Sequence, residues 1–171
     1  EGTQRAFTWT GPYGCGKSSF ALLLTSLVGD SEARARACAL LGENEQILQG
    51  FSADKGWTVL RIVGRQGALI EDIGSRLKTR RTTKAVTSKL AQLAKEASPH
   101  DGVLIIVDEL GKYLEADCAS ENSYLLQELA EFVCRCEYKI VLVGILHQAM
   151  DVYAAKLSMS QRDEWMKVQG R

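Results

Sequence analysis

The sequence predicts an α/β protein, a three-layer α/β/α sandwich around a mainly parallel sheet. Short β-rich or apolar runs alternate along the chain with longer segments of helical periodicity, an order typical of βαβ units. Residues 103–107 (VLIIV) and 139–146 (KIVLVGIL) are almost uniformly apolar, which indicates strands that helices cover on both faces. A chain of 171 residues is long enough to bury its own core, so we expect one domain over residues 1–171.

The other expected elements fill the chain between and around these two strands. Residues 6–10 (AFTWT) alternate weakly and run into a glycine-rich turn, as a strand does, and residues 17–28 are apolar enough for a mostly buried helix. Further elements are expected over residues 31–51 (helical, with breaks at Gly42 and Gly50), 57–63 (strand), 68–77 and 83–97 (helices), 121–136 (helix) and 147–157 (helical).

The composition excludes several classes of protein. With 46% hydrophobic and 25% charged residues, the chain is neither disordered nor of low complexity. Its longest apolar runs are a handful of residues, whereas a spanning helix needs about 20, so we expect no membrane as a partner. Lys plus Arg and Asp plus Glu number 21 each, and this zero net charge gives no global attraction to nucleic acid.

The number and spacing of the cysteines indicate the cellular compartment of the protein. Five cysteines without framework spacing favour a reducing environment, and we expect a cytoplasmic location. Cys134 and Cys136 are two positions apart on an expected helix, so they point in different directions and predict no shared metal.

No signal peptide is visible, and the chain begins with Glu1. We therefore expect a domain that is excised from, or part of, a larger multidomain protein.

A phosphate-binding loop is predicted between the first strand and the first helix. Residues 11–18 (GPYGCGKS) match G-x-x-x-x-G-K-[ST] at every fixed position, in the strand–loop–helix context that distinguishes this motif from a chance glycine turn. Glycines let successive N–H groups converge on phosphate oxygens, while Lys17 reaches the β- and γ-phosphates and Ser18 coordinates Mg²⁺. The residues expected to bind nucleotide are Gly11, Pro12, Tyr13, Gly14, Cys15, Gly16, Lys17, Ser18 and Ser19.

An acidic pair follows the buried strand 103–107. Asp108 and Glu109 would be costly there unless cations or solvent meet them. Because ligands bind at the carboxyl ends of parallel strands, Asp108 is expected to hold Mg²⁺ through its water, and Glu109 to polarise an attacking water as general base. The alternative is an ordinary strand exit into a solvated helix start.

Together these residues resemble the P-loop NTPases. A glutamate directly after the strand-end aspartate resembles the ATPases that carry an added strand between the two motifs, a division that includes the AAA+ and STAND ATPases. The resemblance implies ATP and Mg²⁺ as ligands, and hydrolysis that drives conformational change or assembly of a larger protein. It also implies, as partners, further copies of the chain or further domains of the same protein. AAA+ proteins carry a helical lid after the core, and this chain stops before one.

The same resemblance implies a sensor and an arginine finger. In these ATPases the fourth strand ends in a polar residue that contacts the γ-phosphate. Here residues 139–146 lead into His147, the first candidate, and Gln148, the second; a histidine that only caps a helix is the alternative. Arg162 and Arg171 are the arginines beyond the sensor strand and the candidates to reach a neighbouring subunit's nucleotide, with ordinary surface arginines as the alternative.

Other functions stay open at this point. A non-catalytic ATP-binding switch would use the same residues, and a small-molecule P-loop kinase would use Arg76, Arg80 and Arg81 as lid arginines. A GTPase is disfavoured because the chain lacks N-K-x-D. Residues 78–84 (KTRRTTK) are a possible contact for nucleic-acid phosphates, but without interleaved aromatic residues a solvated helix end is the preferred interpretation.

Overall fold

The computed structural model describes residues 4–42, 55–118, 125–148 and 152–153. Within them lie the strands β1 (Ala6–Thr10), β2 (Thr58–Val63), β3 (Val103–Asp108) and β4 (Ile140–Leu146). The helices are α1 (Lys17–Leu27), α2 (Ser31–Leu41), α4 (Leu69–Arg76), α5 (Thr83–Ala97), α6 (Gly111–Cys118) and α7 (Leu125–Arg135). The four strands form one parallel sheet in the order β1-β4-β3-β2.

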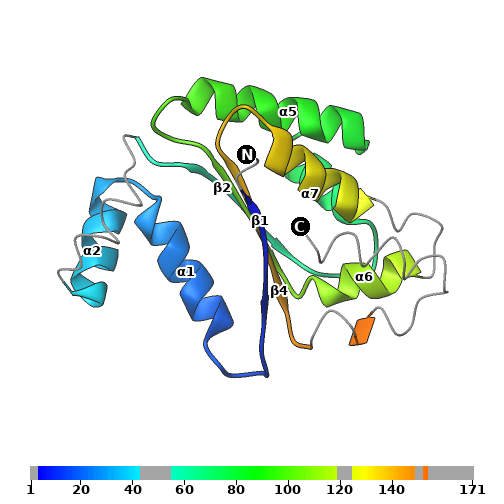
Figure 1. The fold of residues 1–171 in the computed structure, drawn as a ribbon, viewed down its shortest axis with the longest axis horizontal. Coiled ribbons are helices and arrows are strands. Elements are labelled where there is room, and N and C mark those ends of the chain that lie inside the picture. The colour runs from blue at the N-terminus through cyan, green and yellow to red at the C-terminus, as the bar shows by residue number, and fades with distance from the viewer. Residues whose placement is uncertain (1–3, 43–54, 119–124, 149–151, 154–171) are drawn as a thin grey trace.

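Helices cover both faces of this sheet. Figure 1 shows α1 and α2 on one side and α5 and α7 on the other, so the predicted three-layer α/β/α sandwich is confirmed. None of the helices in the described ranges is long and apolar enough to cross a membrane.

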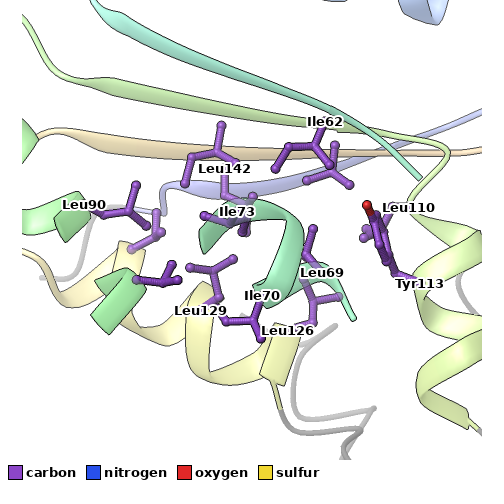
Figure 2. Packing of buried hydrophobic residues seen from close by; sticks show 14 of the residues in the cluster. Ile62, Leu69, Ile70, Ile73, Leu90, Leu110, Tyr113, Leu126, Leu129 and Leu142 are labelled. Atoms are coloured by element: carbon purple, nitrogen blue, oxygen red, sulfur yellow. The ribbon is translucent and has the colours of Figure 1, made fainter. Parts of the chain in front are cut away.

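The two central strands are buried on both faces, as their apolar sequences predict. In β3, Ile105 belongs to the larger core cluster with side chains of α4, α5 and α7, and Ile106 belongs to a second cluster with α1. Figure 2 shows the larger cluster, in which Ile73 of α4 lies between Leu142 of β4 and Leu129 of α7. Alternate residues of each central strand therefore anchor opposite helical layers.

Several expected element bounds differ from the observed ones. Helix α2 ends at Leu41 with Gly42 as its C-cap, which confirms the break there, while residues 43–54 lie outside the described part. Helix α6 was not expected; eight residues are too short to show a clear period. Residues 119–124, before α7, and most of 147–157 also lie outside the described ranges.

The carboxyl ends of the four parallel strands meet at one edge of the sheet. There the backbone after β3 is held from both sides, because Gly64 N donates to Asp108 O at 2.7 Å and Leu110 N donates to Ile145 O at 3.0 Å. Gly64 allows this approach, since a Cβ at that position would overlap the carbonyl of Glu109. The segment from Asp108 to Leu110 is thus fixed at the edge where the loop before α1 also lies.

Candidate functional site

The phosphate-binding motif forms the turn between β1 and α1. Gly14 has a φ of 77° and Gly16 a φ of 90°, a left-handed backbone that side chains disfavour, so conformation requires glycine at both positions. Helix α1 begins at Lys17 with no side-chain cap and no acidic residue in its first turn. Its N-terminal N–H groups and dipole therefore favour an anion.

Lys17 folds back over this motif. Its Nζ donates to Gly11 O at 2.5 Å and to Pro12 O at 2.7 Å, and it lies 3.5 Å from Cys15 Sγ. These carbonyl contacts keep the ammonium group at the loop instead of extended into solvent. The loop therefore combines a fixed cation with the N–H groups of the helix start.

Ser18 and Asp108 are in direct contact although 90 positions separate them. Ser18 Oγ donates to Asp108 Oδ2 at 3.0 Å, and Asp108 Oδ1 accepts from Glu109 N at 2.9 Å. A hydroxyl and a carboxylate oxygen are hard ligands of the kind that Mg²⁺ prefers. No three His, Cys, Asp or Glu residues of the described chain gather as a metal site, so further ligands would be water or substrate phosphate, as is usual for Mg²⁺. The donor set fits this ion.

Glu109 has a strained backbone and two nitrogen neighbours. Its φ of 54° is unfavourable for any residue with a Cβ, and such strain gathers at functional sites. Lys112 Nζ donates to Glu109 Oε2, and this hydrogen bond raises the pKa of Lys112. Glu109 Oε1 lies 4.0 Å from His147 Nε2. The carboxylate is therefore held between α6 and the end of β4.

His147 is stacked against the phosphate-binding motif. Its ring lies 3.8 Å from that of Tyr13, centroid to centroid, with an interplanar angle of 18°. Both imidazole nitrogens are buried, and neither has a hydrogen-bond partner among the described residues. The distance of 4.0 Å to Glu109 is too long for a hydrogen bond. Unpaired buried nitrogens are costly, so this site is suited to receive a further polar group.

A second polar network lies beside the site, at the end of β2. Arg65 Nε donates to Asp72 Oδ2 at 2.9 Å, and Tyr113 OH donates to the same carboxylate. Burial favours a higher pKa for Asp72, but the hydrogen bonds from Arg65 and Tyr113 outweigh it and lower that pKa. Burial, followed by the bond to Asp72, raises the pKa of Tyr113. The network ties α4 to α6 next to Glu109.

Tyr113→Phe should lower the free energy of unfolding by about 1 kcal/mol near neutral pH, because it removes this hydrogen bond. The pKa of Asp72 lies below its usual value in the folded state, so the stability from its ionised contacts is complete above about pH 4. That stability is lost as the pH falls through the folded pKa. Urea titrations near pH 7 and pH 2 should therefore show the difference between wild type and variant shrinking in acid.

The control for this prediction is Tyr138→Phe, since no carboxylate of the described residues contacts that hydroxyl. Its effect on unfolding should be the same at both pH values. A cost of Tyr113→Phe that stays constant with pH would contradict the role given to Asp72.

Three residues beside the predicted ones were not predicted from the sequence: Lys112, Asp72 and Tyr113. Lys112 was detectable in principle, because a cation three positions after Glu109 can pair with it across one helical turn. Asp72 and Tyr113 carry no such signal, since their contact spans 41 positions.

The predicted site residues Lys17, Ser18, Asp108, Glu109 and His147 are together at the carboxyl edge of the sheet. Exposed residues beside them include Cys15, Ser19 and Gln148. Arg162 and Arg171 lie outside the described residues. The chain matches no protein-family model and no curated protein sequence, so conclusions about function depend on the chemistry of these residues.

Proposed function

We propose that this chain is an Mg²⁺-dependent ATPase core whose ATP hydrolysis drives motion or assembly in a larger protein. The observation that carries the proposal is the hydrogen bond of 3.0 Å between Ser18 Oγ and Asp108 Oδ2. It joins a glycine-rich anion loop to a strand-end carboxylate, the combination used around Mg²⁺ beside a bound triphosphate. The position of β4 between β1 and β3 supports the resemblance to ATPases with an added strand.

Each residue of the site would have a separate task. The loop N–H groups and Lys17 would bind the phosphates, and Ser18 and Asp108 would hold Mg²⁺, which supplies positive charge against the phosphate oxygens. Glu109 would accept a proton from the water whose oxygen bonds to the γ-phosphorus. The bond to the bridging oxygen then breaks, and ADP leaves with the electron pair. His147 would donate a hydrogen bond to the γ-phosphate.

A non-catalytic ATP-binding switch is the second candidate, and the pairing of Lys112 with Glu109 favours it. A general base must be free to accept a proton, whereas this carboxylate already accepts a hydrogen bond from an ammonium group. If the ion pair persists when ATP is bound, the protein holds nucleotide without turning it over.

The proposal is tested with the 171-residue chain by measuring ATP binding and phosphate release, with and without Mg²⁺, over a range of protein concentrations. ATP binding with Mg²⁺-dependent release is the expected result. Specific activity that rises with concentration would mean that copies complete one another's sites. Binding without release would support the switch, and no binding would contradict both candidates.

Ser18→Ala isolates the contact that carries the proposal. Its affinity for Mg·ATP should fall at least about tenfold, or about 1.4 kcal/mol, because one ligand oxygen is lost. Nucleotide binding in the presence of a chelator should change little. Ser88→Ala, on the exposed side of α5, is the matched control and should behave as wild type. Equal affinities of the two variants would argue against a metal at Ser18.

A further inference from the structure

One segment of the chain carries an excess of positive over negative side chains. Residues 73–95 contain seven Lys and Arg residues and no Asp or Glu, although the whole chain has 21 of each charge. Five of the seven cations fall within nine consecutive positions around the connection between α4 and α5, and all five are exposed. These five, which we call the basic turn, are Arg76, Lys78, Arg80, Arg81 and Lys84.

The basic turn has a defined backbone. Lys78 N donates to Ser75 O at 3.2 Å and Thr79 N donates to Gly74 O at 2.9 Å, the hydrogen bonds of a helix that ends at a left-handed residue. Lys78 is that residue, with a φ of 52°, where glycine is preferred. A side chain in this conformation costs roughly 1–2 kcal/mol. The chain thus carries a cation where stability favours glycine.

Two of the three arginines of the basic turn, Arg80 and Arg81, pack with their backbone on α4. A Cβ at Gly74 would lie 3.1 Å from Arg81 Cα and 3.2 Å from Arg80 O, so the glycine permits a close approach of the two backbones. Thr82 then caps α5 by accepting from Ala85 N at 3.4 Å. Arg80 and Arg81 are therefore held at the start of this helix.

Folding stability explains Arg76, which lies in the last turn of α4, but not the two arginines that precede α5. Positive charge is unfavourable at a helix N-terminus, yet α5 has no acidic residue in its first turn and is preceded by two arginines. Lys78, Arg80, Arg81 and Lys84 form no ion pair with a carboxylate of the described residues, whereas the charge of Arg76 acts on Asp72 and lowers its pKa. The like charges also repel one another. An anionic partner outside the chain would offset both the unfavourable charge at the start of α5 and the repulsion between the cations.

We propose that the basic turn binds the phosphate backbone of a nucleic acid. Guanidinium and ammonium groups donate to phosphate oxygens, and the hydroxyls of Thr79, Thr82 and Thr83 between them are further donors of the type used on phosphates. Residues 73–95 contain no aromatic side chain, so bases have no stacking platform and binding is independent of sequence. The structure thus favours the phosphate contact over the solvated helix end that the sequence alone suggested.

A protein partner suits this surface less well. Protein interfaces are centred on buried apolar and aromatic side chains. In the described part of the chain, every large hydrophobic side chain that remains exposed lies outside residues 73–95: Phe7, Tyr13, Phe20, Leu22, Leu40, Val63 and Val152. The basic turn offers charge and hydroxyls without an apolar centre. Its chemistry is that of a polyanion site, and the inference does not depend on the proposed ATPase activity.

The test is fluorescence anisotropy of a labelled, mixed-sequence DNA duplex of about 20 base pairs, titrated with the full chain at several salt concentrations. Arg80→Gln combined with Arg81→Gln should weaken binding about tenfold and reduce the slope of log K against log salt by about 2. The matched control, Arg36→Gln combined with Arg61→Gln, removes the same charge from exposed arginines of α2 and β2. Its affinity should stay within about twofold of wild type.

Three results would overturn the inference. The first is no salt-dependent binding of DNA by the wild-type chain, and the second is an equal loss in both double variants. The third is binding of polyglutamate but not DNA, which would identify an acidic protein as the partner. Arg80→Lys with Arg81→Lys should retain the salt slope. The Arg80→Gln and Arg81→Gln double variant could melt at a lower temperature than wild type. In that case Arg76→Gln combined with Lys84→Gln tests the same surface at positions that do not pack on Gly74.

Discussion

Glu109→Gln should slow phosphate release from Mg·ATP by about 10²- to 10⁴-fold while ATP still binds at nearly wild-type affinity. Glutamine keeps the size of the side chain and an oxygen for Lys112, but its amide cannot accept the proton of the attacking water. Asp108, which is expected to hold the metal, is unchanged. Steady-state phosphate release and equilibrium binding of a fluorescent ATP analogue measure the two effects separately.

Glu128→Gln is the matched control for this substitution, because Glu128 is exposed on α7. It removes the same charge and should leave both quantities unchanged. If Glu109→Gln releases phosphate as fast as wild type, Glu109 is not the general base. If the wild-type chain and Glu109→Gln both bind ATP and neither releases phosphate, the non-catalytic switch describes the protein better.

Lys17→Ala should weaken Mg·ATP binding about 100-fold, which corresponds to about 2.7 kcal/mol. The substitution removes the cation that Gly11 O and Pro12 O hold at the phosphate-binding motif. A triphosphate would lose a charge-assisted contact, and the two carbonyls would lose their donor. Isothermal titration calorimetry with Mg·ATP measures this change in the dissociation constant.

The lysine control is Lys95→Ala, at the end of α5. It should bind Mg·ATP as wild type does, and both variants should melt close to wild type because the contacts of Lys17 lie at an exposed loop. An unchanged dissociation constant for Lys17→Ala would remove residues 11–18 from the proposed site.

The fold was predictable where local and long-range preferences agree. The apolar runs over β3 and β4 gave their positions to within one residue, and α5 has the expected bounds because Thr82 supplies an N-cap. The sequence predicted that Ser18 and Asp108 lie at one edge of the sheet, because ligands bind at the carboxyl ends of parallel strands, but it did not predict their direct hydrogen bond.

The remaining features depend on geometry that sequence spacing does not contain. The stacking of Tyr13 on His147 joins the first and last described loops of this edge, and no periodicity signals it. Helix α6 takes its place from Tyr113, which is buried against the larger core. In the basic turn, the charges are visible in the sequence, but the left-handed backbone of Lys78 is not.

The pairing of β1 with β4 bears on the order in which the protein can fold. Ala6 lies opposite Leu142, and Arg5 Nη1 donates to Cys136 O and Tyr138 O, contacts that span 131 and 133 positions. Such non-local contacts require closure of a very long loop, which slows folding. During synthesis the phosphate-binding motif leaves the ribosome well before β4, the strand that pairs with β1 beside it. A nascent chain therefore completes this site only after β4 has emerged.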